Sequence, residues 1–151
     1  EPRVRQWALA NGQGRALVLP VVEHQAMPGL YARMDVLVLP SRQAGFDKEQ
    51  FGRVLAEAMA CGVAVAGSDC GAIPEVIGDG SLVYPQGDVP ALAALLDGLA
   101  DPARRERAAR AGLERAARLF SWRAWAARTA ALLDDLARGR PPRVEREEAC
   151  G

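Results

Sequence analysis

Two glutamates with a glycine between them are the residues of this 151-residue chain best suited to chemistry. Glu49 and Glu57 lie eight positions apart, and Gly52 lies between them. The residues around Glu57, from 54 to 60, are otherwise apolar, as in a buried helix. An ionised carboxylate is costly in such surroundings unless hydrogen bonds are donated to it. A pair of ligand hydroxyls would donate them.

The spacing of the two carboxylates indicates an extended ligand. If a helix begins near Gln50, Glu49 lies at its positive end, and the backbone amides of Phe51, Gly52 and Arg53 are free to hold an anion. At about 1.5 Å of rise per residue, the two carboxylates are roughly 12 Å apart along the axis. Each would contact hydroxyls at one end of a ligand whose phosphates lie between them, as in a nucleotide sugar.

The same residues have a purely structural interpretation. Glu49 would cap the helix, and Glu57 would pair with Arg53 four positions earlier. Gly52 either allows a ligand to approach the backbone closely or forms a tight turn from strand to helix, and both can hold together. Spacing alone leaves these alternatives open.

Short apolar runs alternate with longer helix-like segments, a pattern that predicts an α/β fold with a parallel sheet built from βα units. The expected strands run from Ala16 to Leu19, Val36 to Leu39, Val63 to Ala66 and Leu82 to Tyr84. The expected helices run from about Met27 to Met34, from Phe51 to Cys61, from Val89 to about Leu99 after a cap at Asp88, from Asp101-Pro102 toward Leu119, and from a cap at Ser121 to near Arg138. Helices therefore cover or extend the sheet.

A loop rich in small residues follows the third expected strand, from Gly67 to Glu75. Ligands of open α/β sheets bind at the carboxyl ends of strands, so this loop is expected to border the site. Pro74 suits the first turn of a short helix, and Glu75 suits its positive end. Capping alone is an equal explanation of Glu75.

Composition excludes several classes of function. Lys and Arg total 19 and Asp and Glu total 19, so the absence of net charge disfavours nucleic acid as a partner. No apolar run reaches the roughly 20 residues of a membrane span. The single His24 is expected at the surface, and Cys61, Cys70 and Cys150 lack metal-ligand spacing, so we expect free thiols in a reducing cytoplasm and no cofactor.

Tryptophans and arginines in the last third are expected to be structural. Trp122 and Trp125 share one helix face and, like Trp7, are interpreted as packing residues and not as platforms for base stacking. Arginines interspersed with glutamates give the segment from 104 to 118 a basic face. A solvated face is the favoured interpretation, and contact with anionic lipid at the inner face of the membrane is the alternative.

Four motifs in order resemble a known family. They are Asp35-Val36-Leu37-Val38-Leu39-Pro40-Ser41, then Glu49-x7-Glu57-Ala58-Met59-Ala60-Cys61-Gly62-Val63, then Gly71-Ala72-Ile73-Pro74-Glu75-Val76-Ile77, and Gly87-Asp88. From about residue 18 to 136 the chain is similar to the C-terminal domain of the retaining group 1 glycosyltransferases of GT-B architecture. The resemblance implies a Rossmann-like domain that holds a UDP or GDP sugar for glycan biosynthesis.

The resemblance also implies residue roles. Glu57 would bind the ribose hydroxyls of the donor, and Glu49 would be the catalytic-site residue that binds hydroxyls of the transferred sugar. The other implied donor-binding residues are Phe51, Gly52, Arg53, Ser41 and Gly71. The family usually works without a metal, because positive charges and helix amides stabilise the departing diphosphate.

The chain departs from the family pattern before Val18. The arginine and lysine that hold the diphosphate have no counterpart there, and two opening strands are absent by this comparison, so the chain is expected to be part of a longer protein. In the usual strand order 3-2-1-4-5-6, those two strands lie between the first two strands expected here. The segment from Ala16 to Leu19 should then be poorly anchored or pair directly with the strand from Val36 to Leu39. Ala72 replaces a common Gly or Glu.

These expectations amount to a partial C-terminal nucleotide-sugar-binding domain over residues 1–140 and a flexible tail over 141–151. A missing N-terminal GT-B domain is the expected partner, and the isolated chain is expected to be an inactive piece of a hexosyl-type transferase. The alternatives are a GT-B sugar-nucleotide epimerase and a non-catalytic nucleotide-sugar-binding remnant. The base, the sugar, the acceptor and the oligomeric state stay open.

Overall fold

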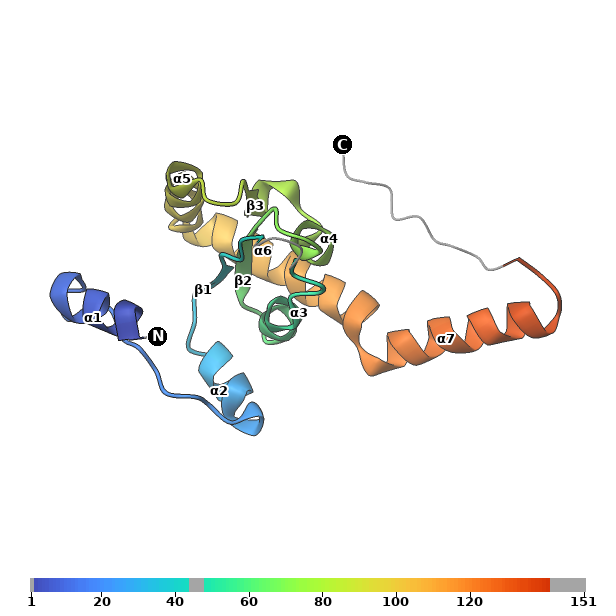
Figure 1. Ribbon diagram of the computed structural model, residues 1–151. Helices are drawn as coiled ribbons and strands as arrows, with labels where there is room; N and C mark the ends of the chain where they lie inside the picture. The colour runs from blue at the N-terminus through green and yellow to red at the C-terminus, as the bar shows by residue number, and fades with distance from the viewer. Residues whose placement is uncertain (1, 44–47, 142–151) are drawn as a thin grey trace.

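A three-stranded parallel sheet lies at the centre of the computed structural model, which describes residues 2–43 and 48–141 (Figure 1). Its strands are β1 (Val36–Leu39), β2 (Ala64–Ser68) and β3 (Val83–Tyr84), in the spatial order β1-β2-β3. Each neighbouring pair is parallel, and helices connect the strands. The expected α/β fold with a parallel sheet and flanking helices is confirmed.

Helices make up most of the remaining structure. They are α1 (Pro2–Asn11), η1 (His24–Ala26), α2 (Met27–Tyr31), α3 (Arg53–Ala60), α4 (Ile73–Ile77), η2 (Gly80–Leu82), α5 (Val89–Leu99), α6 (Pro102–Arg115), the π-helical turn η3 (Ala116–Phe120) and α7 (Trp122–Ala137). The expected caps at Asp88 and Ser121 are confirmed, because each side chain accepts a hydrogen bond from an amide in the first turn of the helix that follows. The side chain of Asp101 caps α6 in the same way.

The core surrounds β2, whose five residues are all buried. Leu55 and Met59 of α3 and Ile73 of α4 are fully inaccessible to solvent. Burying a side chain of this size contributes about 1.5–3 kcal/mol, so this contact holds α3 firmly against the sheet. Helix α6 approaches α3 closely at Gly112, where an added Cβ would lie 3.1 Å from Cγ of Met59. The helix that carries Glu57 is therefore a rigid element.

The prediction of a strand from Ala16 to Leu19 is wrong. Residues 15–23 form no strand, and Leu17 is 82% exposed. Helix α1 and the segment after it lie to one side of the sheet (Figure 1), and within the described residues β1 pairs only with β2. A strand needs a neighbour to accept its backbone hydrogen bonds, and this segment has none. The structure thus gives the first of the two expected outcomes, a poorly anchored segment.

The C-terminal helices differ from expectation in two ways. Helix α6 ends at Arg115 and continues as a π turn, and α7 then projects away from the sheet (Figure 1). Trp122 and Trp125 contact each other edge to face at 5.9 Å between ring centroids, but both are exposed, as is Trp7. Packing into the core of the described chain therefore does not explain these tryptophans. The expected tail, apart from residue 141, lies outside the described residues.

Candidate functional site

The carboxyl ends of the three strands meet at one edge of the sheet, as parallel pairing requires. Leu39 of β1 lies opposite Gly67 of β2, so the loops that follow these strands start side by side. The Ser68 hydroxyl donates a 2.6 Å hydrogen bond to the backbone carbonyl of Ser41, which ties the two loops together. The predicted donor-binding residues Ser41 and Gly71 both lie in these loops.

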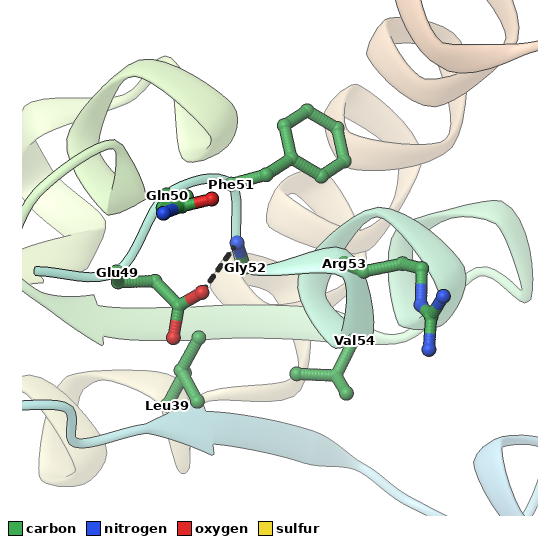
Figure 2. A pocket seen from close by; sticks show the side chains of 7 residues that line it. All are labelled: Leu39, Glu49, Gln50, Phe51, Gly52, Arg53 and Val54. Carbon is green, nitrogen blue, oxygen red and sulfur yellow. Dashed lines mark hydrogen bonds between the residues drawn. The ribbon is translucent and has the colours of Figure 1, made fainter.

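Glu49 is held at this edge by the chain on both sides of it. Its Oε1 accepts a 3.0 Å hydrogen bond from the Gly52 amide (Figure 2), and its Oε2 accepts a 3.3 Å hydrogen bond from the Ser41 hydroxyl. Its backbone carbonyl accepts a 3.0 Å hydrogen bond from the amide of Ala72, so the loop after β2 also supports it. The carboxylate is half-buried and fixed in direction.

Gly71 is adapted to Glu49 in two ways. Its φ of +60° belongs to the left-handed region that favours glycine. A Cβ at this position would overlap the backbone carbonyl oxygen of Glu49. The structure thus adds a packing reason for glycine to the donor-binding role that the sequence predicts for it.

The helix starts later than expected, two residues after Phe51 and three residues after the start near Gln50 on which the predicted anion site depends. Helix α3 begins at Arg53, and Gly52 precedes it with a left-handed φ of +70°. The Gly52 amide is not free for a ligand, because the Glu49 carboxylate accepts its hydrogen. The amides of Arg53 and Val54 belong to the first turn, where no intrahelical acceptor is within reach. The predicted anion site therefore keeps only part of its expected donors.

An open pocket of about 480 Å³ lies over this helix start (Figure 2). Its lining consists of Leu39, Glu49, Gln50, Phe51, Gly52, Arg53 and Val54. The hydrogen-bonded carboxylate lies between the Leu39 side chain and the turn, while the Phe51 ring points away from it. The pocket thus combines one oriented carboxylate, the positive end of a helix and an apolar wall.

Glu57 lies on α3 beyond the lining of this pocket and is half-buried, with 25% of its side chain exposed. Its Oε2 accepts a 2.8 Å hydrogen bond from the Tyr31 hydroxyl, and its Oε1 lies 3.3 Å from Nε of Arg53. The pairing with Arg53 that the structural interpretation anticipated is present. The Arg53 side chain is 80% exposed, so this ion pair contributes little and opens easily.

Tyr31 is a residue that the sequence reasoning missed. It ends α2, is 1% exposed, and meets Glu57 across 26 positions of sequence. No local spacing connects two residues so far apart in the chain.

Burial, reinforced by the hydrogen bond to Glu57 and the negative charge of Glu57, raises the pKa of Tyr31 from 10.0 to about 12. A raised pKa stabilises the fold below pH 10 and loses that contribution as the pH rises toward 12. We expect the free energy of unfolding to fall by on the order of 1 kcal/mol more between pH 8 and pH 11 in the natural protein than in Tyr31→Phe. Urea titrations at each pH measure this difference. The same change of the free energy of unfolding between pH 8 and pH 11 in both proteins would contradict it.

Phe120 is a second residue that the sequence did not reveal. Its ring meets the Phe51 ring edge to face, with 5.4 Å between centroids, and the Arg115 guanidinium lies 6.0 Å from the Phe120 ring. Arg115 also donates hydrogen bonds to the backbone carbonyls of Glu75 and Val76 in α4. The π turn η3 is thereby linked both to the turn before α3 and to α4.

The described residues offer no metal site, and the single histidine and two of the cysteines lie in ordinary surroundings. His24 is exposed, as expected, and within residues 2–43 and 48–141 no three His, Cys, Asp or Glu side chains gather in a way that could hold a metal ion. Cys61 is exposed and Cys70 is buried, both as free thiols, whereas Cys150 lies outside the described residues. None of the helices in the described part of the chain has the length and apolar character needed to cross a membrane.

Known proteins are similar to this chain in sequence and in fold. The chain is 40% identical over 111 residues to the O-antigen chain mannosyltransferase B of Escherichia coli, an alignment that covers 73% of this chain and 28% of the relative. It is 40% identical over 114 residues to a GDP-mannose-dependent α-(1-6)-phosphatidylinositol monomannoside mannosyltransferase of Mycolicibacterium smegmatis, covering 72% of this chain and 30% of the relative. The sucrose-phosphate synthase of Thermosynechococcus elongatus superposes with a TM-score of 0.76 at 30% identity, over 91% of this chain and 34% of that structure.

The chain therefore spans about a third or less of the length of these proteins. The sequence model described as "Glycosyl transferases group 1" matches residues 1–101, two thirds of the chain. The matched region contains β1, β2, β3 and both glutamates of the site. The match and the structural similarity together establish a GT-B type of fold. The chain belongs to the group 1 glycosyltransferases.

Proposed function

We propose that this chain holds a nucleoside-diphosphate sugar and takes part in transferring the sugar to an acceptor with retention of anomeric configuration. The observation that supports this most directly is the fixed direction of two carboxylates, one in the turn before α3 and one on α3 itself. Glu49 is oriented before the first turn of α3 by Ser41 and Gly52, and Glu57 is oriented along the helix by Tyr31. Hydroxyls at both ends of a donor would find acceptors already in place.

The positive end of α3 lies beside Glu49 and suits the diphosphate between the two sugars of such a donor. Glu57 would accept from the ribose hydroxyls, and the Glu49 carboxylate from those of the transferred hexose. We further propose that the clamp for the diphosphate and the wall that faces this pocket come from an N-terminal GT-B domain, so that the 151 residues alone do not turn over.

GDP-mannose is the first donor to test, because the M. smegmatis relative is described as GDP-mannose-dependent and the E. coli relative as a mannosyltransferase. We expect calorimetric titration of the complete gene product to give a dissociation constant for GDP at least tenfold below those for UDP and ADP. With GDP-mannose and a simple α-mannoside as acceptor, nuclear magnetic resonance of the product should identify an α-linkage, which is retention.

Three other outcomes would contradict all or part of the proposed function. Conversion of the nucleotide sugar into its epimer without transfer would favour an epimerase. Binding of no nucleotide at all would contradict the donor-binding proposal. An inverted product would leave donor binding intact and contradict only retention.

A further inference from the structure

We propose that Tyr31 is a positioning residue of the donor site, whose buried hydroxyl holds the Glu57 carboxylate in the orientation that receives the ribose diol of the nucleotide. This inference rests on the proposed role of Glu57 in donor binding. It adds a residue from α2, outside the motifs that carry the family resemblance, to the recognition of the ribose.

The Tyr31 ring cannot move to follow a ligand. It is 1% exposed, belongs to the core cluster and ends α2, which contacts α3. A side chain packed in this way keeps its rotamer, so its hydroxyl has a fixed position. A hydroxyl that cannot reach water needs a protein acceptor, and Oε2 of Glu57 at 2.8 Å is that acceptor.

The two oxygens of Glu57 are held differently. Oε2 is held from inside by Tyr31, while Oε1 is held from outside by Arg53, whose side chain is 80% exposed and contributes little. Each carboxylate oxygen can accept two hydrogen bonds, so Oε2 keeps a lone pair for a ligand while Tyr31 is bound. A ribose diol can therefore displace Arg53 and use both oxygens without disturbing Tyr31.

Fixing Glu57 in advance favours binding. A free glutamate side chain loses rotamer entropy when a ligand orders it, and Tyr31 has already imposed that order in the unliganded protein.

The test compares GDP with 2′-deoxy-GDP in the complete gene product. The ratio of their dissociation constants measures ribose recognition and is insensitive to effects on the base or the diphosphate. We expect Tyr31→Phe, which keeps the ring, to weaken GDP binding by about three- to tenfold and 2′-deoxy-GDP binding by less, so that the dissociation constant for 2′-deoxy-GDP divided by that for GDP falls. In a Glu57→Ala background the same substitution should leave both constants unchanged.

The chain offers a matched control in its other tyrosine. Tyr84 is also a buried residue, in β3, so Tyr84→Phe removes the hydroxyl of a second buried tyrosine and should leave the ratio unchanged. If Tyr31→Phe lowers the melting temperature but leaves the ratio as it is, Tyr31 is only structural and the proposal is wrong. If Glu57→Ala itself leaves GDP binding unchanged, the proposed function of Glu57 fails, which is a distinguishable result.

Discussion

Replacing Glu57 by alanine is expected to weaken the binding of GDP to the complete gene product by about ten- to hundredfold. The substitution removes a carboxylate that would accept from two ribose hydroxyls, and leaving such hydroxyls without a partner costs on the order of 1.5–3 kcal/mol. Isothermal titration calorimetry with GDP measures the effect. A matched control is Glu114→Ala, which removes an exposed glutamate from α6, outside the pocket, and should leave the affinity as it is.

The same substitution affects folding for a separate reason. Without Glu57 the buried Tyr31 hydroxyl loses its acceptor, so Glu57→Ala should also lower the free energy of unfolding by about 1–3 kcal/mol. The double variant with Tyr31→Phe removes donor and acceptor together and should recover part of this loss without recovering GDP affinity. Unchanged GDP affinity in folded Glu57→Ala would show that the carboxylate serves only its structural contacts with Tyr31 and Arg53.

Local signals in the sequence predicted much of the fold. Strand β1 and helix α5 have the predicted bounds, because an apolar run and a cap at Asp88 act within a few residues of themselves. The segment from Ala16 to Leu19 has an equally apolar run but forms no strand. A helix satisfies its hydrogen bonds internally, whereas a strand depends on a neighbour whose presence no local pattern encodes.

In the candidate site too, contacts between residues close in the sequence were predictable, and contacts between distant residues were not. The contact of Glu49 with Gly52 joins residues three positions apart, and the sequence placed this carboxylate just before a helix, although α3 begins only at Arg53. The contacts of Glu57 with Tyr31 and of Phe51 with Phe120 join residues 26 and 69 positions apart. Such contacts arise from packing of whole elements, so no spacing rule could have identified them.

Because we assign Glu49 to the transferred sugar and Glu57 to the ribose, we expect their substitutions to have different effects. Glu49→Gln keeps an oxygen that can accept from the Gly52 amide but removes the negative charge that we propose lies near the transferred sugar. We expect kcat with GDP-mannose to fall by at least about a hundredfold, the scale seen when an oriented transition-state contact is lost. Affinity for GDP, which lacks the transferred sugar, should stay within about twofold of that of the natural protein. Steady-state kinetics and GDP titration separate these quantities, and a hundredfold loss of GDP affinity would contradict the assignment to the sugar end.

Gly71 allows the position of Glu49 to be tested without changing a carboxylate. In Gly71→Ala the added Cβ would overlap the Glu49 carbonyl oxygen, so the segment that carries the carboxylate must shift and kcat should fall as it does in Glu49→Gln. The matched control is Gly62→Ala, because Gly62 has a similar φ of +73° but open space around its Cβ. Both variants strain the backbone by about 1–2 kcal/mol, so a loss of turnover confined to Gly71→Ala reflects displacement of Glu49 and not general destabilisation. Equal losses in both would indicate strain alone.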